Sequence, residues 1–212
     1  YKDISGPDGV PDGVIDEYDK TNIGSPMPKF TFGWTNTFRY KNFDLSIFIN
    51  GSYGNKVYNY LSMKLTHMNS AWTNQLNTIA GRAQLVPINA NKVYADGSHW
   101  YDDVTNVTVA NPGTSVPRAS IQDPNDNDRI SDRYIEDGSY LRFKNITLGY
   151  TFPKQMIKKF GLENLRVYAN IQNLWTITGY DGYDPEIGAS TASTNVYGLD
   201  NGRYPSPTVY SF

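Results

Sequence analysis

Alternation of apolar and polar residues dominates the strand-like parts of this 212-residue chain. Over residues 30–40 the even positions carry Phe, Trp and Tyr, with Asn36 as the exception, whereas the odd positions carry Thr, Gly and Arg. A period of two places these two sets on opposite faces of one strand. The same alternation runs through residues 42–52, and the short turn between the two runs predicts a hairpin of strands 28–40 and 42–52.

The second half of the chain predicts three more strands, over residues 140–152, 164–176 and 206–212. In the first of them Leu141 and Phe143 lie in the opposite phase to the apolar residues that follow, which predicts a bulge near Lys144. A short helix is expected between Pro153 and Gly161, because Pro favours the first helical position and Gly the position just past the end.

The connections between these strands alternate between short and long. The long ones, residues 53–139 and 177–205, are rich in Asn, Asp, Ser and Thr, and the first contains only a modest helical pattern near residues 57–68. Long two-faced strands joined in this way are typical of an outer-membrane β-barrel with long extracellular loops. A soluble sandwich with one solvated face per sheet shows the same alternation, but its loops are rarely this long.

The composition agrees with an all-β membrane protein rather than an ordinary soluble domain. Aromatic residues make up 14% of the chain and charged residues 19%, below the roughly 25% of a typical soluble domain. The net charge of −2 shows no excess of basic residues of the kind that binds nucleic acid. The absence of Cys excludes disulfides, thiolate metal sites and Cys nucleophiles. No apolar run approaches the ~18 residues that a membrane helix needs.

Five strands cannot close a barrel, because both edges would remain unpaired in lipid, where each unsatisfied backbone group costs several kcal/mol. The chain also begins at Tyr1 rather than Met. We therefore expect it to be a fragment of a longer protein.

Several sequence blocks then resemble the C-terminal end of SusC/RagA-type TonB-dependent transporters, outer-membrane proteins of the Bacteroidetes. They occur in the order of that family and cover nearly the whole chain. The blocks are Tyr1-Lys2-Asp3 followed by Asp12-Gly13-Val14-Ile15-Asp16 and Asp19, Asn50-Gly51-Ser52-Tyr53-Gly54-Asn55, Asp137-Gly138-Ser139-Tyr140-Leu141-Arg142, Lys144-Asn145-Ile146-Thr147-Leu148-Gly149-Tyr150, Asn173-Leu174-Trp175-Thr176 and Gly182-Tyr183-Asp184-Pro185-Glu186.

This resemblance implies a plugged antiparallel membrane β-barrel of about 22 strands, of which the chain would supply the last five. It implies a multi-pass protein of the cell outer membrane that imports oligosaccharides or peptides. A SusD-like surface lipoprotein would be its extracellular partner, and the TonB complex would act through an N-terminal part that this chain lacks. Residues 1–27, 53–139 and 177–205 would be extracellular. Phe212 fits the terminal aromatic residue of such barrels, although family members usually continue a few residues further.

The loop of residues 1–27 contains a candidate calcium site. Measured against the EF-hand template, Gly13 falls at the turn position and Val10 at a position that should carry a ligand side chain. Asp3 or Ser5 would fill that gap from upstream. We expect a structural Ca²⁺ ion, although an Asx-rich turn without metal is the alternative. The expected ligands are Asp3, Asp8, Asp12, the carbonyl of Val14, Asp16 and Asp19.

A second acidic run, Asp123–Asp128, lacks the turn glycine of the EF-hand, and we interpret it as a solvated turn. Aromatic residues in the long loops could stack on sugar rings, contact the lipoprotein or pack among the loops themselves. The candidates for ligand or lid contact are Trp72, Trp100, Tyr101, Tyr180 and Tyr183.

No enzyme motif is present in the chain. His67 and His99 lie far apart in sequence, and there is no HExxH, G-x-S-x-G or phosphate-binding loop. We therefore expect a transporter rather than an enzyme. A soluble carbohydrate-binding or adhesin β-module is the main alternative, and a secreted glycoside hydrolase is a third. The even residues of strand 28–40 discriminate between the first two, because they face outward in a barrel and into a core in a sandwich.

Overall fold

The computed structural model describes residues 1–69, 72–123, 126–186 and 196–212. The chain divides into two compact units, one made of Tyr1–Tyr60 with Ser131–Phe212 and the other of Leu61–Ile130. No helix in the described part combines the length and the hydrophobicity needed to cross a membrane.

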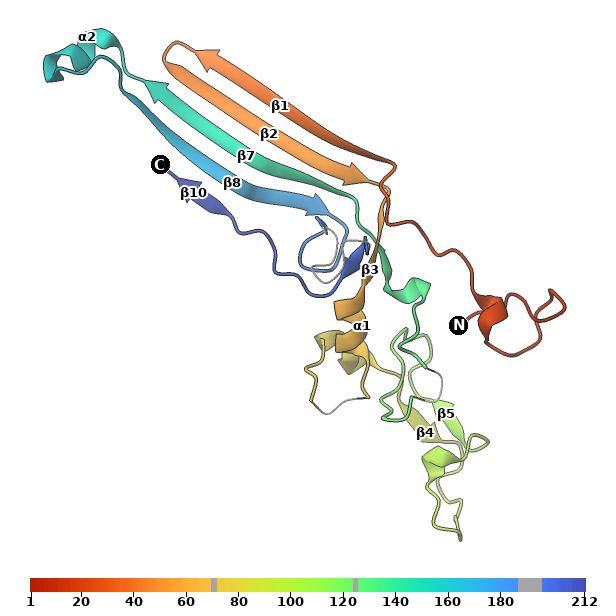
Figure 1. The fold of residues 1–212 in the computed structure, drawn as a ribbon. Helices are drawn as coiled ribbons and strands as arrows, with labels where there is room; N and C mark the ends of the chain where they lie inside the picture. The colour runs from red at the N-terminus through yellow and green to blue at the C-terminus, as the bar shows by residue number, and fades with distance from the viewer. Residues whose placement is uncertain (70–71, 124–125, 187–195) are drawn as a thin grey trace. The chain divides into compact units, whose positions relative to one another are not determined.

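The first unit is built on a five-stranded antiparallel sheet, in which the strands lie side by side in the order β1-β2-β7-β8-β10 (Figure 1). The antiparallel all-β class is therefore confirmed, but the sheet does not close into a barrel. Instead, β1 and β10 stand at its two edges. The strands are β1 (Phe30–Tyr40), β2 (Phe43–Tyr53), β7 (Tyr140–Thr151), β8 (Arg166–Thr178) and β10 (Val209–Ser211).

The last strand is shorter than the predicted range 206–212. Pro205 and Pro207 have no N–H to donate to a ladder, which is why regular pairing begins only at Val209. Side chains replace the missing ladder bonds: Asn173 Nδ2 donates to the carbonyl of Pro207 at 3.0 Å, and the Thr208 hydroxyl donates to the carbonyl of Asn173 at 2.9 Å.

The pairing register gives the sheet one apolar and one polar face. Because directly opposed residues share a face, single rows across the sheet show the difference. One apolar row is Trp34, Ile49, Phe143 and Trp175, and one polar row is Thr37, Ser46, Thr147, Asn170 and Ser211. Trp34 is 59% exposed and Tyr40 71% exposed, so the even residues of β1 do not enter a core within the described chain, as a sandwich would require.

A bulge interrupts the middle of the sheet. The register between β2 and β7 shifts between Phe48 and Ile49, and that between β7 and β8 shifts between Phe143 and Asn145. The bulge predicted near Lys144 is thus confirmed. Asn173 of the neighbouring strand adopts a positive φ of 52° at the same level.

Short connections lie at one end of the sheet. Lys41, with φ of 52°, forms the tight turn between β1 and β2. β7 and β8 are joined by α2 (Lys154–Ile157) and η5 (Lys158–Phe160). The latter ends at Gly161 with φ of 71°, which a residue with a side chain rarely adopts. The helix predicted between Pro153 and Gly161 is confirmed.

The long connections begin at the other end of the sheet. They contain short strands that the sequence did not predict. β3 (Lys56–Asn59) pairs antiparallel with β6 (Ile135–Asp137) and parallel with β9 (Leu199–Asp200). This small sheet joins the two regions that the sequence predicted as separate loops. Val57 belongs to β3, where its side chain is 1% exposed. The helix expected from residue 57 therefore begins only after this strand, at Tyr60.

The remaining short elements lie in the connections. α1 (Tyr60–Thr66) leads into the unit Leu61–Ile130, where β4 (Leu85–Pro87) pairs with β5 (Val107–Val109). Asn106, 4% exposed, stabilises this hairpin by donating to the carbonyl of Asn89 and the hydroxyl of Tyr94. Single 3₁₀ turns are η1 (Glu17–Asp19), η2 (Asn77–Gly81), η3 (Trp100–Asp102) and η4 (Asp132–Tyr134).

Candidate functional site

A buried arginine organises the polar face of the sheet near the long connections. Arg142 of β7 is 3% exposed, and its Nε donates to the hydroxyl of Thr176 on β8 at 2.8 Å. The guanidinium forms an ion pair with Asp184 and a second one with Glu186, Nη1 to Oε2 at 2.7 Å. A buried guanidinium needs such partners, because an unpaired charge away from water is very costly.

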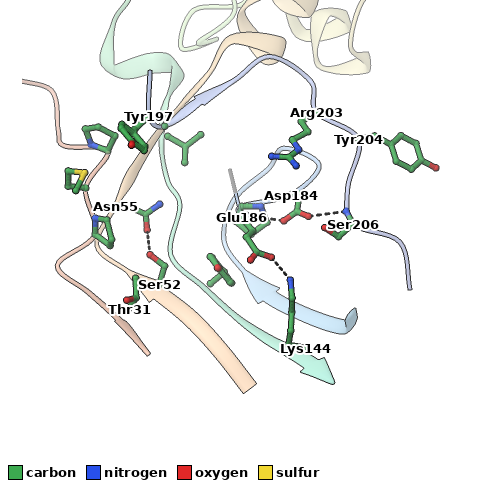
Figure 2. A pocket seen from close by; sticks show the side chains of 17 residues that line it. Thr31, Ser52, Asn55, Lys144, Asp184, Glu186, Tyr197, Arg203, Tyr204 and Ser206 are labelled. Atoms are coloured by element: carbon green, nitrogen blue, oxygen red, sulfur yellow. Dashed lines mark hydrogen bonds and ion pairs between the residues drawn. The ribbon is translucent and has the colours of Figure 1, made fainter. Parts of the chain in front are cut away.

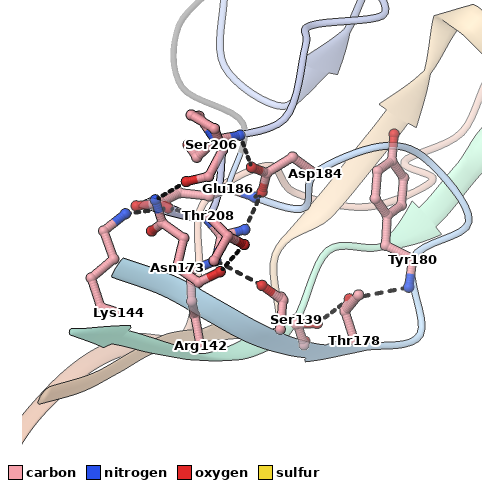
Figure 3. A network of polar contacts seen from close by, with 12 residues as sticks. Ser139, Arg142, Lys144, Asn173, Thr178, Tyr180, Asp184, Glu186, Ser206 and Thr208 are labelled. Carbon is pink, nitrogen blue, oxygen red and sulfur yellow. Dashed lines mark hydrogen bonds and ion pairs between the residues drawn. The ribbon is translucent and has the colours of Figure 1, made fainter. Parts of the chain in front are cut away.

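The bulge at Lys144 adds a second cation to this network. Lys144 Nζ lies 2.9 Å from Glu186 Oε2, so Glu186 bridges two basic residues of β7. Asp184 in turn accepts hydrogen bonds from the backbone N–H of Glu186 at 2.9 Å and of Ser206 at 3.2 Å (Figure 3). The network therefore fastens two stretches of the long connection onto the strand face.

The carboxyl group of Asp184 stays ionised in this environment. Its burial acts to raise the pKa, but the hydrogen bonds from Arg142 and from the backbone N–H groups outweigh burial and hold the pKa below its ordinary value. The side chain is therefore a charged fastening point at neutral pH rather than a proton donor.

A second buried pair supports the start of the same connection. The Tyr180 hydroxyl donates to Asp200 Oδ2 at 2.5 Å, and Asp200 is only 2% exposed. Asp200 Oδ1 accepts from the backbone N–H of Gly202 at 2.9 Å. Burial, followed by the Asp200 carboxylate, raises the pKa of the Tyr180 phenol well above its ordinary value. The hydroxyl therefore remains a donor.

A pocket of about 550 Å³ lies beside the network, within the first unit (Figure 2). This volume falls in the range of small-ligand sites, and the mixed lining suits a ligand with both an apolar surface and polar groups. Among the residues that line it are Tyr140, Lys144, Glu186, Tyr197, Arg203 and Tyr204.

The loop aromatics predicted as contact residues have different environments. Tyr180 is 6% exposed and its hydroxyl is bound to Asp200, so it is not an exposed contact. Tyr183 is 63% exposed in the first unit. In the second unit Trp72 is 97% exposed, while Trp100 and Tyr101 contact each other edge to face.

The predicted calcium ligands are only partly brought together. Asp3 Oδ2 accepts from the N–H of Gly13 at 2.6 Å, which places this upstream residue beside the turn glycine. Asp19 accepts from the backbone N–H groups of Ile4 and Asp16, and these bonds lower its pKa. Asp12 Oδ1 accepts from the N–H of Val14 at 2.9 Å.

Across the described residues, one set of three His, Asp or Glu ligand atoms lies within 4.8 Å of each other, and it consists of His67, Asp123 and Asp128. The acidic segment 3–19 forms no such set.

Sequence reasoning missed the central role of Arg142. Asp184 and Glu186 appeared in the sequence only within one of the ordered blocks, and their partner Arg142 is about forty residues away. The one signal in the sequence was an arginine between Leu141 and Phe143, two apolar residues next to the change of phase.

Comparisons with known proteins bear on the whole chain. No family model matches it. It is 34% identical over 204 residues to TonB-dependent receptor P3 of Formosa agariphila, an alignment that covers 94% of this chain and 17% of that protein. It is 30% identical over 203 residues to TonB-dependent receptor SusC of Bacteroides thetaiotaomicron, covering 93% of this chain and 16% of SusC.

Solved structures give the same picture of the fold. A chain of the RagAB peptide importer in its closed-closed state matches 97% of this chain with a TM-score of 0.66 and 20% identity. The open-open state of the importer matches 96% with a TM-score of 0.65 and 21% identity. Our chain covers 19% of that chain in each case, so it spans less than a fifth of the length of these relatives.

Proposed function

We propose that this chain, which is homologous to SusC/RagA-type TonB-dependent receptors over most of its length, forms the C-terminal part of the wall of an outer-membrane importer. The observation that carries the proposal is the two-faced sheet. Its apolar face suits lipid, its polar face with Arg142 suits a wet lumen, and its open edges suit pairing with further strands of a barrel.

Labelling of neighbouring residues on β1 tests this arrangement. The 212 residues contain no Cys, so a thiol introduced at Trp34 or at Thr35 is the only one in this part of the purified receptor. We expect Thr35→Cys to react with a water-soluble maleimide, and Trp34→Cys to react much more slowly, because a lipid-facing thiol is shielded and forms little thiolate. Equal reactivity of both thiols, or a receptor that stays soluble and monomeric without detergent, would favour the soluble carbohydrate-binding or adhesin module instead.

We also propose that the intact receptor takes up oligosaccharides or peptides together with a SusD-like surface lipoprotein, with energy supplied by the TonB complex. The RagAB structures are described as a peptide importer, which supports the peptide alternative. The pocket beside Arg142 would face the substrate path, and its tyrosines would contact either class of substrate.

Growth of a strain lacking the receptor gene decides between the substrate classes. Cells with the intact receptor are given mixed peptides or mixed oligosaccharides as the growth-limiting nutrient, beside a strain lacking the receptor gene. We expect the deletion to abolish growth on one class only. Unchanged growth on both would contradict the transport proposal.

A structural Ca²⁺ ion in residues 1–27 is also proposed. Asp3 Oδ1 is buried and has no hydrogen-bond partner, while its other oxygen accepts from Gly13. An unpaired carboxylate oxygen beside a turn glycine suits Ca²⁺, which takes six to eight oxygen ligands. Asp19 fits less well, because both its oxygens already accept backbone N–H groups.

Proteolysis tests the calcium proposal. We expect a chelator to accelerate cleavage within residues 1–27 of the intact receptor, and Ca²⁺ to restore the protection. Asp3→Asn should lose this response, whereas Asp126→Asn, in the second unit, should retain it. Cleavage that is independent of Ca²⁺ would show an Asx turn without metal.

A further inference from the structure

We propose that His67, Asp123 and Asp128 bind a divalent transition-metal ion, and that Zn²⁺ is the ion that this ligand set suits best. One imidazole and two carboxylates each offer a ligand atom, and the three atoms lie within 4.8 Å of one another. We refer to these residues as the His67 cluster. It lies wholly within the unit Leu61–Ile130, so the proposal is independent of the transport function.

Local structure fixes His67 in a buried position. It follows directly after α1, whose last residue, Thr66, donates its hydroxyl to the carbonyl of Ser62 at 2.8 Å. The carbonyl of Leu65, two residues before His67, accepts a hydrogen bond from the N–H of Leu76 at 3.0 Å. His67 is 9% exposed, and its Nε2 lies 2.8 Å from Asp123 Oδ2.

Two residues with a positive φ angle shape the turn that carries the carboxylates of the cluster. Asp123 has φ of 37° and Asp126 has φ of 45°, conformations that residues with a side chain rarely adopt. Successive turns follow, because the N–H of Asp126 donates to the carbonyl of Asp123 at 2.9 Å and that of Arg129 to the carbonyl of Asp126 at 3.0 Å. They return the chain so that Asp128 lies beside His67 and Asp123.

The Asp123 carboxylate retains capacity for a metal ion. It accepts from His67 and from the backbone N–H of Asn127 on Oδ2, and from Asn127 Nδ2 on Oδ1. A carboxylate offers about four acceptor positions, so one on Oδ1 is left. Asp123 is 9% exposed, and a buried carboxylate with an unused acceptor position beside an imidazole suits a cation.

The ligand chemistry selects the ion. Zn²⁺ binds imidazole nitrogen and carboxylate oxygen at about 2.0–2.2 Å, whereas Ca²⁺ prefers six to eight oxygen atoms. Neutral imidazole binds a metal through its unprotonated nitrogen. Binding at Nε2 therefore replaces the hydrogen bond to Asp123 and leaves the single ring proton on Nδ1. Asp128 is exposed and can turn toward the ion, and water would occupy the fourth position.

Such an ion would cross-link residues that are distant in sequence. His67 and Asp123 are 56 positions apart and lie near the two ends of the second unit. A metal ion bound by both residues would stabilise the folded unit. It would do so because closing the long loop between its ligands reduces the conformational entropy of the unfolded chain.

Zinc binding to the purified intact receptor tests the proposal. The chelator-treated receptor is titrated with Zn²⁺ by calorimetry, and with Co²⁺, whose visible absorption reports tetrahedral coordination. We expect His67→Gln to lose one Zn²⁺ per chain and Asp128→Asn to weaken binding at least about 10-fold. His99→Gln and Asp102→Asn are the matched controls and should bind as the wild type does, because neither residue belongs to the cluster.

Asp128→Asn keeps the test decisive if His67→Gln fails to fold, because Asp128 is exposed. Unchanged zinc affinity in Asp128→Asn would overturn the proposal, as would a wild-type receptor that binds no Zn²⁺ at micromolar concentration. Binding of Ca²⁺ in preference to Zn²⁺ at these residues would overturn it as well.

Discussion

Arg142 is a charged side chain that folding removes almost completely from water. Its two carboxylate partners, Asp184 and Glu186, belong to the connection after β8. The free-energy cost of burying the guanidinium is therefore offset only when this connection is folded against β7. Replacing Asp184 leaves Glu186, whose side chain is about one third exposed, as the remaining carboxylate partner of the buried guanidinium. The network is therefore sensitive to that substitution.

Asp184→Asn should therefore release the connection from the strand face. We expect a loss of about 3 kcal/mol, because one partner of a buried ion pair disappears. That corresponds to roughly 100-fold faster hydrogen exchange in the peptide that contains Ser206, whose N–H donates to Asp184. The control is Glu186→Gln, where the carboxylate is about one third exposed and a smaller effect is expected. Equal effects of both substitutions would contradict the dominant role of Asp184.

The pH dependence of the same network follows from the lowered pKa of Asp184. A carboxyl group whose folded pKa lies below its unfolded value stabilises the fold fully above that unfolded value, about 3.8. The contribution is lost as pH falls through the folded pKa. Exchange corrected for the intrinsic rate should thus stay constant from pH 7 to pH 5 and rise only below about pH 4. In Asp184→Asn this acid-dependent rise should be much smaller.

At the scale of elements, the strands are determined by a local pattern. Side chains alternate along a strand, so the sequence itself assigns each residue to a face, and the change of phase at Lys144 located the bulge. The short strands β3, β6 and β9 carry no such pattern, because each has only two to four residues and forms through long-range pairing.

Two glycines in the β1–β2 hairpin should respond differently to substitution. A Cβ at Gly51 would collide with the backbone carbonyl of Tyr140 and the ring of Phe32, whereas one at Gly33 would meet only the Phe48 ring at 3.3 Å. We expect Gly51→Ala to destabilise the receptor by about 1–3 kcal/mol, because overpacking forces the backbone to shift. The measurement is the temperature at which the folded receptor loses its resistance to SDS. Gly33→Ala should stay close to the wild type, and equal losses would contradict the prediction.

At the scale of the whole molecule, homology confirms the resemblance to SusC/RagA-type receptors that the ordered sequence blocks indicated. These relatives are transporters rather than enzymes, in agreement with the lack of catalytic motifs. The five-stranded sheet has two open edges, and the chain covers less than a fifth of its relatives.

The 212-residue chain expressed alone should consequently fail to form a stable monomer in the membrane. The edges β1 and β10 would expose unpaired backbone groups to lipid, each at a cost of several kcal/mol. We expect aggregates or edge-paired oligomers by size-exclusion chromatography in detergent, whereas the intact receptor should be folded and resist SDS. A monodisperse monomer of the chain alone would contradict this expectation.

The sequence by itself determined the strands, their two faces, the bulge and the family resemblance, because all of these depend on local periodicity or on ordered motifs. It could not place Asp184 beside Arg142, pair β3 with β9, bury Tyr180 against Asp200 or bring His67 to Asp123. Those contacts join residues from twenty to more than one hundred positions apart, and no periodic pattern encodes such distances. Only the tertiary structure decides them, since burial makes a charged or polar group take whichever partner the fold places within reach.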